Sequence, residues 1–270
     1  MTRAGAGLAA EERLGHDPTS ELWGEHRSRY RFACDRVSGR RVLDIACGVG
    51  FGLAMLCQAG GRVVGMDLDA AALAAAAQAV AGPAPLARSD AARLPLRDAS
   101  MDVVVSFETL EHVPDAAATV REFRRILRPS GLLVLSTPNR AYGPPERHQN
   151  NPFHVREFTA EELRDLLGES FGTVVLYGQL PAPGYRYVPY LMTAPTWQPS
   201  AVAWKMMRRL PFAARDALAR GLTGRPFYPG EADYQFVAGR TAASHNLVAV
   251  ASGFSSHSDS NSHSNTEPRP

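Results

Sequence analysis

Three side chains capable of chemistry stand within five residues at the end of one apolar run. Residues 101–107 read "MDVVVSF", and the "ETLEHV" that follows supplies Glu108, Glu111 and His112. If the chain turns helical there, these residues occupy positions i, i+3 and i+4 and share one helix face. Two carboxylates and an imidazole so arranged suit a divalent metal ion or acid–base chemistry. The alternative is a solvated polar turn, and the surrounding elements must decide between the two.

Apolar runs of strand length alternate with helical patterns through the first half of the chain. The strand-like runs are "RVLDIA" at 41, "RVVGMD" at 62, "PLARSD" at 85, "MDVVVSF" at 101 and "GLLVLST" at 131. Continuous apolar strands separated by helices predict a parallel sheet covered on both faces, in an α/β fold. Such sheets bind ligands at the carboxyl ends of their strands. Glu108, Glu111 and His112 are therefore expected beside a ligand.

The second half of the chain has a different rhythm. "TVVLYG" at 173 and "NLVAVA" at 246 predict a sixth and a seventh strand, and an insertion at about 179–245 between them is expected to form a lid. Residues 1–20 and 253–270 are polar or rich in small residues, and both segments are predicted to be disordered. Residues 21–252 then form one domain.

Composition and charge exclude several classes of protein. The net charge of +2 over 270 residues is too small to indicate a nucleic-acid surface. Three cysteines without a CxxC pair indicate neither a disulfide framework nor a structural zinc site. The chain opens without the apolar run of a signal peptide, and no stretch reaches the roughly 20 apolar residues of a membrane span. We therefore expect a cytoplasmic protein without a membrane span.

A glycine-rich turn follows the first predicted strand. In "DIACGVGFG", Gly48 and Gly50 let a ligand approach the backbone, and a carboxylate at Asp67, about 20 residues on, can accept both hydroxyls of a ribose. A dinucleotide fingerprint has the form G-x-G-x-x-G, and Gly52 stands one position too early for it. The turn thus predicts a ribose-containing ligand that is not a dinucleotide.

Five segments in order, over roughly residues 40–140, carry a family resemblance. "VLDIACGVGFG", "VVGMDLD", "RSDAARLPL", "MDVVVSFETLEHV" and "LRPSGLLVLSTPN" together resemble the successive motifs of class I S-adenosylmethionine-dependent methyltransferases. The resemblance implies a Rossmann-like, seven-stranded methyltransferase sheet whose last strand is antiparallel, with S-adenosylmethionine as cofactor. The implied cofactor residues are Asp44, Gly48 and Gly50 at the methionyl end, Asp67 at the ribose, Asp90 and Ala91 at the adenine, and Phe107 closing the pocket.

The end of the fourth predicted strand indicates the type of acceptor atom. Methyltransferases that act on the amino groups of bases carry an Asn/Asp-Pro-Pro-aromatic turn there, whereas this chain reads "SFET". The resemblance therefore disfavours an exocyclic amine and leaves a hydroxyl. Because the pKa of an alcohol lies far above 7, the enzyme must supply a base or a metal ion.

The E-x-x-E-H pattern, taken with the later "NPFHVREFT", resembles two groups of O-methyltransferases. These are the small-RNA terminal 2'-hydroxyl methyltransferases and the ubiquinone-type enzymes, in which the motif binds a divalent ion. The resemblance implies a Mg²⁺ or Mn²⁺ site made of Glu108, Glu111, His112 and His154. Glu111, His112 and His154 are also the candidate catalytic residues. In the alternative without a metal, His112 or His154 is a general base.

Two segments of the sequence indicate the class of acceptor. "STPN" and "NPFHVREFT" resemble methyltransferases of saccharide and natural-product pathways, which implies a sugar, a glycan or a glycosylated natural product. A quinol or catechol and the 2'-hydroxyl of RNA are the alternatives, although the weak net charge disfavours nucleic acid. A nucleotide-cofactor-binding protein without catalysis is a third class. Arg156 and Glu157 are expected to form a surface salt bridge.

Overall fold

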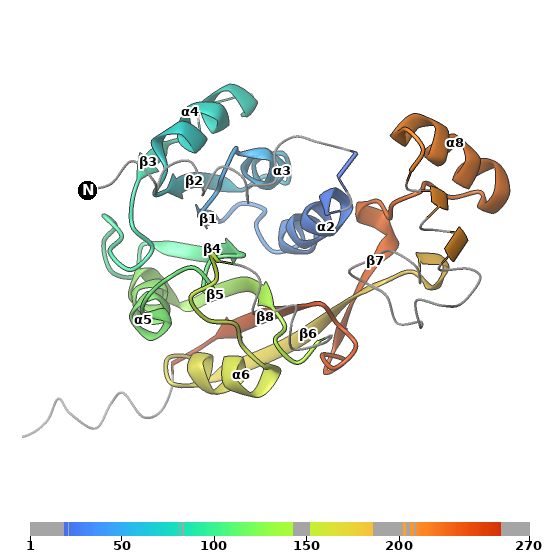
Figure 1. Ribbon diagram of the computed structural model, residues 1–270. Coiled ribbons are helices and arrows are strands. Elements are labelled where there is room, and N and C mark those ends of the chain that lie inside the picture. The colour runs from blue at the N-terminus through green and yellow to red at the C-terminus, as the bar shows by residue number, and fades with distance from the viewer. Residues whose placement is uncertain are drawn as a thin grey trace, which may run out of the picture.

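The computed structural model describes residues 19–20, 22–80, 82, 84–142, 152–185, 202–203, 206–207 and 209–254. Within this part of the chain, one mixed sheet lies between two layers of helices (Figure 1). Nearly all of the predicted disordered segments, 1–20 and 253–270, lie outside the described residues. So does part of the predicted lid, including 186–201.

The sheet has eight strands. They are β1 (Arg41–Ile45), β2 (Arg62–Asp67), β3 (Leu86–Arg88), β4 (Met101–Phe107), β5 (Leu127–Pro138), β6 (Thr173–Pro181), β7 (Tyr234–Ala238) and β8 (Asn246–Ser252), in the spatial order β3-β2-β1-β4-β5-β8-β6-β7. The strands from β3 to β5 pair in parallel, and β8 runs antiparallel to both of its neighbours, β5 and β6. The parallel sheet and the antiparallel last strand are as predicted.

The predicted count of seven strands is wrong for the described residues. The extra strand is β7, which comes from within the predicted insertion and pairs antiparallel with β6 at the edge of the sheet. β6 also continues to Pro181, beyond the predicted start of the insertion at 179. The "YQFVA" of β7 is short and only half buried, so it lacks the apolar run that identified the central strands. The insertion is therefore confined to residues 182–233.

The described helices are α2 (Trp23–Cys34), α3 (Phe51–Gln58), α4 (Ala70–Ala79), α5 (Ala116–Ile126), α6 (Ala160–Gly168) and α8 (Phe212–Thr223), with short 3-10 turns at η2 (Pro183–Tyr185) and η4 (Glu231–Asp233). Alternate strand residues face opposite layers. Val103 and Val105 pack with α2 and α3, while Val104 packs with α5 and α6. Both faces of the central strands are thus buried, which explains their continuous apolar runs.

The described part of the insertion has a small core of its own and leans on α2. This core consists of Ala219 of α8 together with Tyr185, Phe227 and Tyr228. Arg27 Nε of α2 pairs with Glu231 Oε2 of η4 at 2.6 Å. In Figure 1, α2 accordingly lies between the sheet layer and the insertion. This position makes α2 a wall shared by both parts.

Candidate active site

One cavity of about 810 Å³ gathers most of the residues singled out in the sequence. It opens where β1, β2 and β4 end at the carboxyl edge of the sheet, as expected for an α/β fold. The predicted cofactor residues that line it are Gly48, Asp67, Asp90, Ala91 and Phe107. The predicted acceptor-side residues that line it are Glu108, Glu111, His112 and His154.

The turn after β1 opens the backbone to a ligand. Gly48 has φ +54°, and a Cβ at this position would meet no atom within 4 Å. The Gly48 N–H donates to Asp67 Oδ2 at 2.9 Å, and the Asp69 N–H donates to Oδ1 at 2.9 Å. A carboxylate oxygen can accept more than one hydrogen bond, so a carboxylate at this position suits a ribose. The glycine turn and the end of β2 are therefore joined into one unit by these two hydrogen bonds.

Asp44 and Gly50 support this turn from behind and do not line the cavity. Asp44 is fully buried, and the Tyr30 hydroxyl donates to its Oδ1 at 3.2 Å. Burial raises the pKa of Asp44 to about 8, against the lowering effect of the Tyr30 hydrogen bond and with a further raise from the Asp67 charge. Gly50 has φ +85°, and a Cβ there would lie 2.7 Å from the Ala76 Cβ. Asp44 and Gly50 thus help to hold the turn in its conformation.

The remaining predicted cofactor residues differ in their surroundings. Asp90 is exposed at the rim, where its Oδ1 accepts a hydrogen bond from the Ala92 N–H at 2.9 Å. Ala91 and Phe107 are buried. The Phe107 ring packs edge-on against Tyr30 of α2, with 4.9 Å between the ring centroids. Phe107 and Tyr30 together form an aromatic wall at the end of β4.

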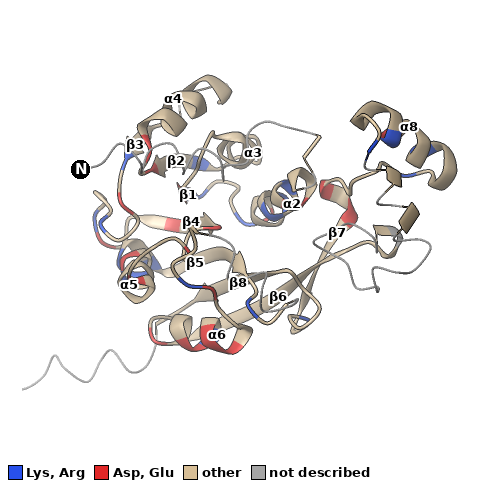
Figure 2. Ribbon diagram, in the orientation of Figure 1, with Lys and Arg blue, Asp and Glu red and all other residues tan. Residues whose placement is uncertain are grey.

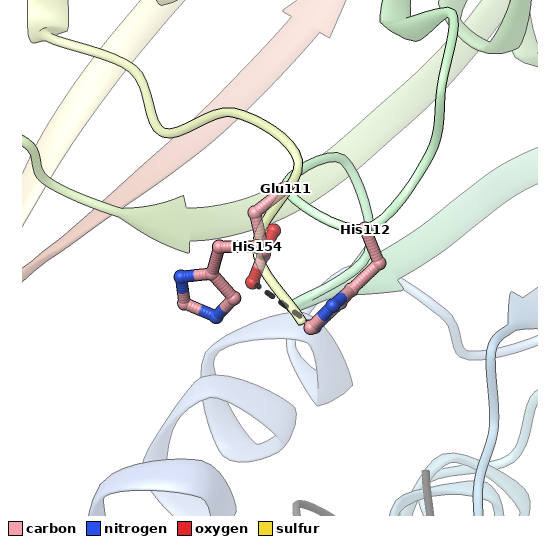
Figure 3. Close-up of side chains that lie close together, drawn as sticks. All are labelled: Glu111, His112 and His154. Carbon is pink, nitrogen blue, oxygen red and sulfur yellow. Dashed lines mark ion pairs between the residues drawn. The ribbon is translucent and has the colours of Figure 1, made fainter. Parts of the chain in front are cut away.

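Glu111, His112 and His154 converge on the other side of the cavity (Figure 3). One ligand-capable atom from each residue lies within 4.8 Å of those of the other two. The segment with His154 is held in place because the Val155 N–H donates to the Glu111 carbonyl oxygen at 2.7 Å. Residues more than 40 positions apart are thereby brought together.

In both imidazoles, Nδ1 lies next to an oxygen that can accept its proton. His112 Nδ1 lies 3.1 Å from the Phe153 carbonyl oxygen, and His154 Nδ1 lies 2.6 Å from Glu157 Oε1. An acceptor at Nδ1 holds the proton there and leaves the lone pair on Nε2 of a neutral ring. Such a nitrogen can take a proton or coordinate a metal ion.

Glu111 is fully buried, with an incomplete set of hydrogen bonds. The Thr137 hydroxyl donates to Oε2 at 3.0 Å, whereas Oε1 has no hydrogen-bond partner among the described residues. His112 Nε2 lies 3.9 Å from this Oε1. Burial, with the charge of Glu108, holds the pKa of Glu111 well above its usual range. A buried oxygen without a partner next to two imidazole nitrogens is the chemistry expected of a ligand site.

Glu108 does not join this group, which corrects the expected helical arrangement. Residues 108–112 form a turn, and Glu108 adopts the left-handed φ of +51°. Positions i, i+3 and i+4 therefore do not share a face. The Ser136 hydroxyl donates to Glu108 Oε1 at 2.7 Å, and Arg29 Nη2 lies 3.9 Å from the same oxygen. The structure directs Glu108 toward α2.

Part of this chain is similar to known proteins. Residues 43–135 match the family model described as a methyltransferase domain. This part of the chain is therefore similar to a methyltransferase domain. A protein of Mycolicibacterium smegmatis described as a "Probable S-adenosylmethionine-dependent methyltransferase" is 41% identical over 143 residues, which are 53% of this chain and 55% of that protein. The ubiquinone biosynthesis O-methyltransferase of Pseudomonas aeruginosa is 39% identical over 108 residues, covering 38% and 47% of the two chains.

These matches are partial. The chain spans about half the length of the curated relatives that it matches. Among solved structures, an S-adenosylmethionine-dependent methyltransferase from Thermotoga maritima superposes with a TM-score of 0.57 at 17% identity, covering 85% of this chain and 89% of that one. At that identity the likeness concerns the fold. The Rossmann-like methyltransferase fold predicted from the five motifs is thereby confirmed.

Several residues that line the cavity were not predicted from the sequence. Glu157 is buried and orients His154, which corrects its expected surface pairing with Arg156. Glu25 and Arg29 reach the cavity from α2, and Asn246 reaches it from the start of β8. For Glu25 and Arg29, the signal in the sequence is the i, i+4 spacing of an acid and a base in "EHRSR". That spacing is common on solvated helices and carries no prediction of burial.

The cavity lining and the described helices bear on two further predictions, the lid at 179–245 and the lack of a membrane span. Among the described residues of 179–245, His245 alone lines the cavity, and the described body of the insertion packs behind α2. In the described part of the chain, no helix is both long and apolar enough to span a bilayer.

Proposed function

We propose that the protein transfers the methyl group of S-adenosylmethionine to a hydroxyl oxygen of a small molecule. The convergence of Glu111, His112 and His154 in the same cavity as the glycine turn carries the proposal. On one side lies a cradle that suits the donor. On the other side lie groups that can take the proton a hydroxyl must lose.

In this proposal the donor binds along the ends of β1, β2 and β3. Asp67 accepts the ribose hydroxyls, the open backbone at Gly48 receives the methionyl part, and Asp90 with Ala91 borders the adenine. Asp44 and Gly50 keep the turn in shape. The donor supplies an electrophilic methyl group on a sulfonium, so the chain's main task is to hold the acceptor oxygen in line with it.

The acceptor oxygen is activated at the Nε2 atoms. The new bond joins the hydroxyl oxygen to the methyl carbon as the sulfur–carbon bond breaks, and the hydroxyl proton passes to Nε2 of His112 or His154. Glu157, at 2.6 Å from His154 Nδ1, stabilises the imidazolium that results. S-adenosylhomocysteine leaves as a neutral thioether.

A divalent ion, Mg²⁺ or Mn²⁺, is the second form of the same proposal. Glu111 Oε1 and the two Nε2 atoms offer three ligands with room for substrate oxygens, and the buried, unpartnered Oε1 supports this form. Glu108 would enter such a site only after leaving Ser136 and Arg29. A bound ion would lower the pKa of the hydroxyl that it contacts.

For the acceptor we propose a hydroxyl of a sugar, a glycan or a glycosylated natural product. The polar side chains of Glu25, Arg29 and Asn246, which line the cavity, favour such a molecule. A quinol or catechol is the second candidate, because a relative 39% identical over 108 residues acts in ubiquinone biosynthesis by its name. RNA is disfavoured, because acidic residues on α6 and basic residues on α2 and α8 are mixed over the described elements (Figure 2). Three free cysteines favour a cytoplasmic setting.

The test is transfer of label from methyl-tritiated S-adenosylmethionine to methyl glucosides, catechol and a short RNA. We expect label in the glucosides, and loss of transfer in His154→Ala and Glu111→Gln with S-adenosylhomocysteine binding retained. Glu169→Gln, at the exposed end of α6, is the matched control and should keep full activity. Transfer that persists in both site variants would contradict the proposal.

The metal form has its own readout. Titration of Mn²⁺ into the metal-free protein, followed by electron paramagnetic resonance, measures binding without any acceptor. Binding that Glu111→Gln abolishes, with activity lost in EDTA and restored by Mn²⁺, supports the ion. Full activity in EDTA leaves His112 or His154 as a base without a metal.

A further inference from the structure

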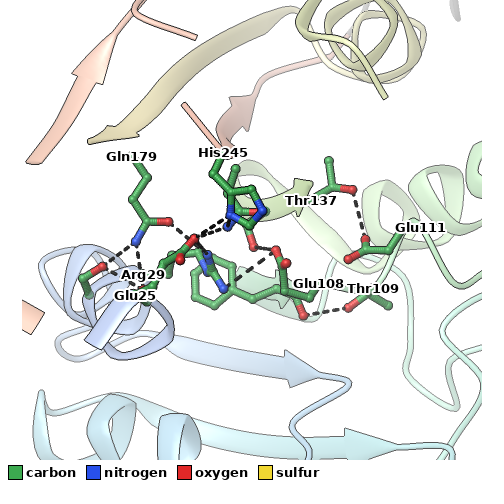
Figure 4. Close-up of polar contacts among 12 residues, drawn as sticks. Glu25, Arg29, Glu108, Thr109, Glu111, Thr137, Gln179 and His245 are labelled. Atoms are coloured by element: carbon green, nitrogen blue, oxygen red, sulfur yellow. Dashed lines mark hydrogen bonds and ion pairs between the residues drawn. The ribbon is translucent and has the colours of Figure 1, made fainter. Parts of the chain in front are cut away.

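A second cluster of buried polar side chains lines the same cavity, on the side of α2 and β8 (Figure 4). It is built on Glu25, Arg29 and Asn246, whose exposed fractions are 2%, 1% and 2%. Burying three polar side chains together is unfavourable unless each atom finds a partner. Neither the proposed donor site nor the group of Glu111, His112 and His154 includes these residues.

The cluster is held rigidly from below. Arg29 Nη1 donates to Gln179 Oε1 at 2.9 Å and to Glu25 Oε1 at 3.3 Å. Gln179 Nε2 in turn donates to the Glu25 carbonyl oxygen at 2.8 Å, which ties α2 to β6. Asn246 Nδ2 donates to the same Glu25 Oε1. The side chains are therefore fixed before any ligand arrives.

Four atoms of this rigid cluster lack a hydrogen-bond partner among the described residues. They are Glu25 Oε2, Arg29 Nε, Arg29 Nη2 and Asn246 Oδ1. A buried polar atom left unpaired costs the protein stability, so four in one cluster indicate a ligand that completes them. Two are acceptors on different residues, and two are donors on one guanidinium.

The charges select the class of ligand. The His245 hydrogen bond and the charges of His245 and Arg29 outweigh burial and lower the pKa of Glu25 to about 2, so Glu25 is a carboxylate opposite the Arg29 cation. An anionic ligand would meet this carboxylate, and a cationic one would meet the guanidinium. A neutral group that both donates and accepts suits the four atoms, and a hydroxyl is such a group.

We propose that Glu25, Arg29 and Asn246 form an acceptor-recognition subsite for two adjacent hydroxyls of a neutral, hydroxyl-rich ring. One hydroxyl donates to Glu25 Oε2 and the other to Asn246 Oδ1, while both accept from Arg29. Glu108, 3.9 Å from Arg29 Nη2, links this subsite to the turn that carries Glu111 and His112. The subsite rests on the proposed O-methyl transfer and orients a third hydroxyl toward the Nε2 atoms.

The test measures binding of methyl α-D-glucopyranoside, methyl α-D-mannopyranoside and cyclohexanol to the protein saturated with S-adenosylhomocysteine. Saturation-transfer nuclear magnetic resonance reports the dissociation constants. We expect saturable binding of at least one hexoside and much weaker binding of cyclohexanol. Asn246→Leu should raise the hexoside dissociation constant about tenfold, since a lost hydrogen bond leaves buried groups unpaired. Glu25→Gln is the second variant, with a similar volume and no charge.

Asn139→Leu is the matched control. Asn139 is equally buried, but its amide donates to the Thr241 and Ser244 carbonyl oxygens and it does not line the cavity. It should lose stability and keep hexoside affinity. Calorimetry with S-adenosylhomocysteine is run on every variant.

Three outcomes overturn the subsite. They are no saturable hexoside binding to the wild type, unchanged affinity in both Asn246→Leu and Glu25→Gln, and a parallel loss of S-adenosylhomocysteine binding. The last would assign the cluster to the methionyl carboxylate of the donor. Hexoside binding that depends on Asn246 but is followed by no label transfer supports the subsite and contradicts the O-methyl transfer proposed above.

Discussion

Buried carboxylates in this protein behave according to their immediate partners. Asp67 accepts two backbone N–H groups, whereas Asp44 lies in the core and accepts, among the described residues, from the Tyr30 hydroxyl alone. Glu25 is surrounded by donors that lower its pKa, so it stays charged. Glu111 lacks such donors, and burial raises its pKa. The residue type alone therefore does not determine whether a carboxylate here is ionised.

Asp44 makes a measurable contribution to the pH dependence of stability. Its pKa is raised by burial from an ordinary value near 3.8 to about 8, so the folded state binds more protons than the unfolded state between these values. Stability contributed by the protonated form is complete below pH 3.8 and is lost as pH rises toward 8, with a slope that approaches ~1.4 kcal/mol per pH unit. Asp44→Asn should flatten this fall and raise stability at pH 8. Urea unfolding of both proteins at pH 5, 6.5 and 8 measures it, and parallel pH profiles would refute it.

At the scale of elements, α2 joins the parts of the site. Its Tyr30 packs on Phe107 at the end of β4 and bonds to Asp44 of β1, while its Arg29 reaches Gln179 of β6. The segment 152–157 is the second such connection, since it brings His154 back to Glu111 through backbone hydrogen bonds. The geometry of the site thus depends on elements far from one another in sequence.

Gly52 shows how closely α2 and α3 approach. A Cβ at Gly52 would lie 2.0 Å from Tyr30 Cζ, so Gly52→Ala should displace Tyr30 and destabilise the protein by ~1–3 kcal/mol. S-adenosylhomocysteine binding should weaken as well, because Tyr30 supports Asp44 and Phe107. Gly168→Ala in α6 is the control: a Cβ there meets nothing within 4 Å, and stability should hold or rise. Equal unfolding free energies for the two variants would exclude the close approach.

At the scale of the whole molecule, the proposed donor and acceptor groups line one cavity built from both halves of the chain. Residues between 45 and 91 line its proposed donor side, and α2 lines the rest together with residues between 107 and 246. A ligand that bridges these elements stabilises the folded state as a unit.

S-adenosylhomocysteine should therefore raise the melting temperature. At 100 times its dissociation constant it adds ~2.7 kcal/mol, which for a domain of this size corresponds to ~5–11 °C. NAD should cause no shift, since Gly52 packs against Tyr30 and does not complete a dinucleotide turn. Asp67→Ala should lose most of the shift. Asp102→Ala is the control, because Asp102 pairs with Arg128 away from the cavity and should keep it. An equal shift with NAD would contradict the assigned donor.

The sequence alone determined the parallel α/β sheet, the glycine turn, Asp67 and the position of Glu111 and His112 at a strand end. These features follow from local patterns, namely apolar runs, glycines after a strand and side chains at its carboxyl end. Tertiary structure alone decided that Glu108 turns toward Arg29, that Glu157 orients His154, and that β7 joins the sheet. It also assembled the cluster of Glu25, Arg29 and Asn246, whose members are separated by up to 221 positions. Contacts between distant residues and a left-handed backbone angle have no periodic signature in the chain, because they arise only when packed elements exclude the alternatives.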